Sequence, residues 1–377
     1  MGLFPSQSKS LKRRGAVLAL VAAAGLATCL LALRSRVVTL AAGERETATT
    51  RTAGRAGRAQ PAHGATRPHT SRLPGVAGGR TPDVSAPVAA AREFIASLQA
   101  PDTAQLRDTV RTAIGLGTDP DPRHRQRVIN ELPKTQELSP EELRALYCFL
   151  AAKDPARYGS TANNALKNDI LTHLIRDGAP VPDEVLPLML GMFYDSDQDR
   201  AWRDYVLQHF LYFVEQTWPD PQTPNLADDA QFTAVRDAYW DATRELDTSI
   251  AGTALIGLEF LSRSYAAFDR DEVLAAAGSI ARSADACDAV RATAVQVCAN
   301  ARNRDVLPVA QQIARSDDAG VPLRMAAIAA IGDLGAATDT AFLARFIPNP
   351  GARTASDTRL QTAAASAIER IKRREAL

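Results

Sequence analysis

Apolar residues recur at helical spacing in the stretch V-P-L-R-M-A-A-I-A-A-I-G-D-L-G, residues 321–335, which has only two charged side chains. Two apolar stripes run along it. The first contains Leu323, Ala327, Ala330 or Ile331, and Leu334, and the second contains Met325, Ile328, Ala329 and Gly332. Because a helix that is apolar almost all round is buried on several sides, the pattern predicts a helix packed among other helices.

This stretch belongs to an internal repeat. The segment 306–327 lies 33 residues after the segment 273–294, and 11 of their 22 aligned positions are identical. The second helix of the repeat recurs again 37 residues later. In this third copy Leu323, Ala326, Ala327, Ala330 and Ile331 align with Leu360, Ala363, Ala364, Ala367 and Ile368. Self-similarity at this period is typical of solenoids built from helix pairs.

The repeated residues resemble the HEAT and HEAT-like (lyase-type) helical repeats, most clearly over residues 250–374. The arginine in V-R-A-T-A and in L-R-M-A-A matches the start of that family's second helix, and an aspartate six residues earlier matches its turn. The resemblance implies stacked antiparallel helix pairs. It also implies that Asp285 with Arg291, and Asp318 with Arg324, tie each turn to the following helix as a structural pair. The third copy departs from the pattern, with Gln361 in place of the arginine.

The same alternation of helices continues more loosely towards the N-terminus, with less regular helices expected over residues 85–133. Helix-start residues such as Ser139-Pro140 stand before apolar stretches, and no alternating strand pattern competes with the helical one. We therefore predict an all-α protein whose residues 86–377 form an α-solenoid of six or seven HEAT-like helix pairs.

An uncharged, mostly apolar segment at residues 15–33 is long enough to cross a membrane, and a basic tail, residues 1–14, precedes it. A cleaved signal sequence has the same start. Arg34 and Arg36 follow the apolar segment directly, which favours an uncleaved transmembrane anchor. We expect a single-pass membrane protein with its N-terminus inside and its repeat domain outside the cytoplasm; secretion after signal cleavage is the alternative.

Residues 34–85 are rich in Ala, Arg, Thr, Gly and Pro and contain no aromatic residue. Such a segment buries too little apolar surface to offset its ordering entropy, so we predict a disordered linker. Residues 1–80 carry a net charge of +11 and residues 81–377 a net charge of −10. The acidic repeat domain repels nucleic-acid phosphates, so binding of nucleic acid or another anionic polymer is an alternative only for the basic linker.

Candidate chemistry is sparse. The stretch D-S-D-Q-D-R at residues 195–200 starts like a calcium loop, but Arg200 and Val206 stand where such a loop needs Gly and Glu. The four cysteines lack the close spacing of a metal site, and His173 and His209 lie in apolar helical stretches where a structural role is expected. No catalytic residue, metal or cofactor is predicted.

Aromatic residues concentrate between Phe193 and Trp240. Within this segment Trp202, Tyr205, His209 and Tyr212 share one helical stripe, which makes them candidates for binding a partner if their polar tips are exposed and core residues if they are not. Truncating Trp202 or Tyr205 is expected to weaken partner binding more than folding.

These patterns predict a membrane-tethered, non-catalytic scaffold that binds an unidentified protein partner. A HEAT-like enzyme or an enzyme-associated assembly factor is the alternative, because some HEAT-like proteins are lyases.

Overall fold

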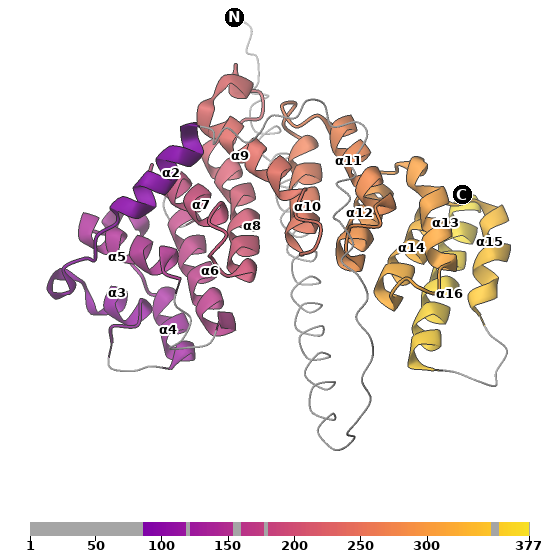
Figure 1. The fold of residues 1–377 in the computed structure, drawn as a ribbon, viewed down its shortest axis with the longest axis horizontal. Coiled ribbons are helices and arrows are strands. Elements are labelled where there is room, and N and C mark those ends of the chain that lie inside the picture. The colour runs from indigo at the N-terminus through magenta and orange to yellow at the C-terminus, as the bar shows by residue number, and fades with distance from the viewer. Residues whose placement is uncertain (1–85, 118–120, 154–159, 177–179, 348–353, 377) are drawn as a thin grey trace, which may run out of the picture. The chain divides into compact units, whose positions relative to one another are not determined.

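The computed structural model describes residues 86–117, 121–153, 160–176, 180–347 and 354–376, all within one compact unit, Leu73–Leu377. Every regular element in these ranges is a helix, and the ranges contain no strand (Figure 1). The predicted all-α fold class is confirmed for this part of the chain. The predicted basic tail, anchor and linker, residues 1–85, lie outside the described residues. Among the described helices, none combines the length and apolar character needed to span a membrane.

The helices after residue 107 form seven consecutive pairs. The first helices of the pairs are α3 (Asp108–Ala113), α5 (Pro140–Ala151), α7 (Val185–Phe193), α9 (Ala230–Ala242), α11 (Arg270–Arg282), α13 (Leu307–Arg315) and α15 (Ala337–Leu343). The second helices are α4 (Pro122–Ile129), α6 (Ser160–Arg176), α8 (Arg200–Thr217), α10 (Ile250–Ser262), α12 (Asp288–Asn300), α14 (Val321–Leu334) and α16 (Ala355–Glu375). Short 3₁₀ helices lie at Thr103–Gln105, Thr135–Glu137, Leu226–Asp228, Arg304–Val306 and Ala344–Phe346.

The pairs stack in one direction. Each first helix packs against its own second helix, and each second helix also packs against the second helix of the next pair, from α4 to α16. This nearest-neighbour ladder is the packing scheme of a solenoid, in which each repeat buries its apolar face against its neighbours. The predicted α-solenoid is thus present in the described residues.

Helix α14 shows why its sequence is so apolar. It contacts α12, α13 and α16, and Leu323, Ala327 and Ile331 are fully buried. A Cβ atom at Gly332 would lie 2.8 Å from the Cα atom of Ala367 in α16, so the two helices approach too closely for a side chain there. The small residues are therefore required by the spacing between second helices.

The repeated arginines contact a common backbone partner but not the predicted aspartates. The Nε atoms of Arg291 and Arg324 donate to the carbonyls of Ala281 and Ala314, each at 3.3 Å and each at the end of the preceding helix.

The carboxylates that these arginines meet are Asp288, at 3.9 Å from Arg291, and Asp317, at 3.2 Å from Arg324. The predicted pairs with Asp285 and Asp318 are therefore wrong, because the nearby Asp288 and Asp317 lie within ion-pair distance of these arginines instead. Asp288 is the first residue of α12 and lies one helical turn before Arg291. Its Oδ2 atom accepts a hydrogen bond from the Gly320 amide, in the turn between α13 and α14, at 2.6 Å.

One helix lies outside the ladder. Helix α2 (Ala86–Ser97) packs on α7 and also touches α9, covering first helices of two pairs. The close approach of α2 to α7 depends on Gly191 of α7. A Cβ atom there would lie 2.8 Å from the Ile95 side chain and 2.9 Å from the Ala91 carbonyl oxygen, both in α2. Because α2 covers one side and the pairs the other, every residue from Val185 to Phe193 except Pro187 is buried.

Candidate protein-interaction surface

Helix α8 carries the predicted aromatic stripe. It starts after Asp199, whose Oδ1 atom accepts the Ala201 and Trp202 amides at 3.0 and 3.1 Å. The Asn164 side-chain amide of α6 donates to the same oxygen at 2.7 Å. The cap therefore sets the start of the helix and its rotation against α6, which decides which aromatic residues turn inwards.

Trp202 is turned into the core. Its side chain is fully buried, and its indole Nε1 atom has no hydrogen-bond partner among the described residues. The Lys167 ammonium lies 5.3 Å from the Trp202 ring centroid and donates to the Ala152 carbonyl at 2.5 Å. Burial lowers the pKa of Lys167 to about 8. The expected exposure of the polar tip is therefore wrong for Trp202, which supports the α6–α8 contact.

His209 is also a core residue. It is 2% exposed, and its Nε2 atom lies 3.1 Å from the Asn168 Oδ1 atom of α6. Burial lowers the pKa of His209 to about 3, so the ring is neutral at physiological pH. This matches the structural role expected for this histidine and excludes the exposed polar tip.

Tyr205 and Tyr212 differ from these two residues because both are half-buried. The Arg176 guanidinium of α6 stacks 3.9 Å from the Tyr212 ring centroid and covers part of it. Of the four predicted residues, these two tyrosines alone retain accessible ring surface.

The neighbouring helix α10 adds two residues that the sequence analysis missed. Ile256 is one of three large apolar residues that the described chain exposes, with 36% of its surface accessible, and Phe260 one turn later is half-buried. They follow Ser249 and Thr253 on the open side of α10. The sequence did contain a signal for this exposure. Ile256 and Phe260 continue the helical spacing of the polar residues Ser249 and Thr253, not that of the buried residues of the helix.

Helices α8 and α10 pack directly against each other (Figure 1). The Ser249 hydroxyl donates to the Asp204 Oδ2 atom at 2.6 Å and fixes their register. We refer to Tyr205, Tyr212, Ile256 and Phe260 as the α8–α10 patch.

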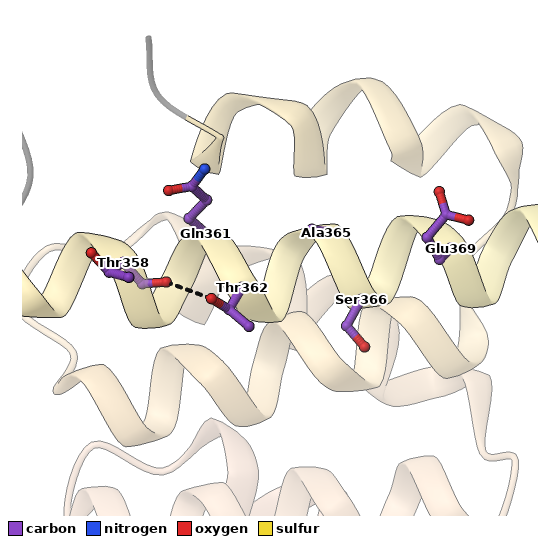
Figure 2. Close-up of a pocket in the computed structure, with 6 residues that line it drawn as sticks. All are labelled: Thr358, Gln361, Thr362, Ala365, Ser366 and Glu369. Carbon is purple, nitrogen blue, oxygen red and sulfur yellow. Dashed lines mark hydrogen bonds between the residues drawn. The ribbon is translucent and has the colours of Figure 1, made fainter. Parts of the chain in front are cut away.

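A hollow lies on α16 and is lined only by that helix (Figure 2). Thr358, Gln361, Thr362, Ala365, Ser366 and Glu369 line it. When α16 is aligned with α14, Ser366 and Glu369 of α16 correspond to Ala329 and Gly332 of α14. In α14 these two positions contact the following second helix, α16. Polar side chains at these positions are typical of a capping face, so we assign no ligand to it.

The other candidate residues, in the loop before α8 and among the cysteines, show no binding or catalytic arrangement in the described part of the chain. Asp195 and Asp197 of the loop before α8 bind Lys153 at 2.8 and 3.3 Å, as a solvated turn does. Cys148, Cys287 and Cys298 are free thiols. The described residues contain no group of three His, Cys, Asp or Glu side chains that could hold a metal ion.

The fold defines an α-helical repeat protein, in which successive helix pairs share one continuous core. Residues 274–369 match the family model described as HEAT repeats, and the resemblance read from the repeated residues is confirmed. Comparison with curated proteins and with solved structures gave no match.

Proposed function

We propose that the protein is a membrane-tethered helical-repeat scaffold that binds a protein partner through the α8–α10 patch without catalysing a reaction. The observation that carries this proposal is the exposure of Ile256 on α10, with Phe260 half-buried on the same helix and Tyr205 and Tyr212 half-buried on the adjoining helix α8. Aromatic and aliphatic side chains of this kind supply most of the binding energy in protein interfaces.

The ladder of second helices suits this role. These helices hold one another in register from α4 to α16, so a side chain on their open side is presented by a rigid element. Binding then orders few groups on the scaffold, which keeps its entropic cost low. The membrane tether rests on the apolar segment 15–33, which lies outside the described residues.

Site-specific photo-crosslinking in native membranes tests the binding role. A photoreactive amino acid at position 256 is compared with the same group at Ala275, which is exposed on α11, a first helix. We expect position 256 to form a discrete protein adduct and position 275 to form none. Equal labelling from both positions, or no adduct from position 256, would contradict binding at this patch, and turnover of a small molecule that depends on the patch would favour the enzyme alternative.

A further inference from the structure

Acidic residues concentrate in the part of the solenoid that carries the α8–α10 patch. Residues 180–290 contain 20 Asp and Glu but only 7 Lys and Arg, a net charge of −13. The described residues after 290 contain 8 acidic and 11 basic side chains, a net charge of +3. The negative charge of the repeat domain is thus localised to the helices from α7 to α11.

Two carboxylates of α8 adjoin the patch residues along the helix, and they differ in accessibility. Asp204 precedes Tyr205, but its Oδ1 atom is buried and its Oδ2 atom accepts the Ser249 hydroxyl, so it is closed to a partner's cation. Glu215 lies one turn beyond Tyr212 on the exposed side of the helix. Burial first, and Glu215 in addition, raise the pKa of both Tyr212 and Tyr265. Neither carboxylate forms an ion pair with a described Lys or Arg within salt-bridge distance. The Arg176 guanidinium acts on Glu215 only from beyond salt-bridge distance, so this exposed carboxylate can still take a closer cation from a partner.

We infer that the α8–α10 patch binds a basic segment of the partner protein, with an aliphatic or aromatic side chain of that segment on Ile256 and Phe260 and its Lys or Arg residues beside the exposed Glu215. This inference rests on the proposed scaffold function. Opposite charge raises the association rate and selects the partner, while the apolar contact supplies the affinity. An acidic segment, a nucleic acid or an anionic lipid surface would be repelled by the same field.

Ile256 has a matched control elsewhere in the solenoid. Ile347 has a similar exposed fraction, 39% against 36%, but it follows α15 in the basic C-terminal part of the chain. The variants Ile256→Ser and Ile347→Ser therefore remove the same exposed apolar surface at sites of opposite local charge. Because both side chains are exposed, neither substitution is expected to unfold the domain.

The test uses full-length protein in detergent micelles as the target for selection from a library of short random peptides. We expect the selected peptides to combine Lys and Arg with an aliphatic or aromatic residue and to bind less tightly as salt is raised. Ile256→Ser should weaken the selected peptides by about tenfold, whereas Ile347→Ser should leave their affinity unchanged. Glu215→Gln should reduce the salt dependence.

Two results would overturn the inference. One is selection of acidic or uncharged peptides, and the other is peptide binding that Ile256→Ser and Ile347→Ser weaken equally. A crosslink from position 256 to the arginine-rich residues 34–85 of the same chain, with none to another protein, would also overturn it. If position 256 still crosslinks to a partner protein while the selected peptides are not basic, the scaffold function stands and only the partner's chemistry is wrong.

Discussion

Burial separates two aromatic residues of α8 that their sequence spacing places together. Trp202 is fully buried beside Lys167, whereas Tyr205 is half-buried on the open side of the helix. Trp202→Ala opens a cavity and should lower the free energy of unfolding by about 3–5 kcal/mol. Tyr205→Ala should cost less than about 1.5 kcal/mol, because it removes little buried surface. Chemical denaturation followed by circular dichroism measures both, and equal losses would place Tyr205 in the core as well.

The buried His209 ring makes stability depend on pH. Its pKa is about 3 in the fold and about 6.5 when exposed in the unfolded chain, so the unfolded state binds more protons between these values. Stability is therefore complete above pH 6.5 and falls as the pH drops towards 3. Between pH 7 and pH 5 the loss from this group should be about 1–2 kcal/mol.

The variant His209→Gln isolates this effect, because glutamine does not titrate and can still bond Asn168. Its stability should change less than that of the native protein between pH 7 and pH 5. Glu142 contributes little over this interval, because its pKa is lowered to about 2 in the fold by its bond to Arg107 and its ordinary value of 4.5 also lies below pH 5. Parallel pH profiles for the two proteins would show that His209 is not the responsible group.

At the scale of the element, helix α14 tests the packing of the repeats. Ile331 is fully buried between neighbouring pairs, so Ile331→Asp places an unpaired charge in the core. We expect a loss of more than about 3 kcal/mol, with faster hydrogen exchange across α12 to α16. Ile347→Asp is the control, because its exposed side chain should make the same change nearly neutral. A stability change near zero in Ile331→Asp would contradict buried packing of α14.

The attachment of α2 depends on one glycine. Gly191→Ala would place a methyl group 2.8 Å from Ile95, so α2 must shift away from α7 at a cost of about 1–3 kcal/mol. Gly278→Ala in α11 is the matched control, because its Cβ atom would meet nothing closer than the Arg282 guanidinium at 3.6 Å. Alanine there should stabilise the helix by about 0.5–1 kcal/mol.

Hydrogen exchange measured by mass spectrometry distinguishes the two variants. Gly191→Ala should speed exchange in residues 86–97 and leave α12 to α16 unchanged, while Gly278→Ala should not affect α2. Unchanged protection of residues 86–97 in Gly191→Ala would show that the helix tolerates the added methyl group.

Most of the ladder was predictable because helical periodicity records burial along each helix. The helix start at Ser139-Pro140 and the helix over residues 321–335 were expected where α5 starts and where α14 lies. The position of α2 was not predictable, because its contact with α7 joins segments about ninety residues apart in sequence. The contact requires a glycine, Gly191, in α7, and helical periodicity does not reveal such a requirement. The ion partners of Arg291 and Arg324 were missed for a related reason: the local backbone geometry, not the sequence spacing, decides which aspartate comes within reach of the arginine.

The α8–α10 patch was half predictable. A helical stripe places Tyr205 and Tyr212 together, but the same stripe contains Trp202 and His209, and only the rotation of α8 against α6 separates exposed from buried members. Ile256 lies in a helix that is apolar on most sides, where sequence does not reveal which apolar residue is left uncovered.

For the whole molecule, charge is distributed unevenly along the chain, from a basic N-terminal part to the acidic helices around the patch. The tether predicted at residues 15–33, in the predicted orientation, would hold the acidic helices outside the cytoplasm. The proposed basic partner would then have to be reached on that side of the membrane.

Deleting residues 1–36 tests the tether on the intact repeat domain. The apolar segment alone is expected to hold the protein in the membrane, so its removal should transfer the protein from the membrane fraction to the soluble fraction with its helical circular dichroism unchanged. Leu20→Arg combined with Val21→Arg is the matched control, because it retains the length of the chain and makes insertion of the segment costly by several kcal/mol. Both variants should behave alike. A full-length, uncleaved protein that already fractionates as soluble would show that residues 15–33 are not an anchor, and a shortened N-terminus in mature protein would identify a cleaved signal instead.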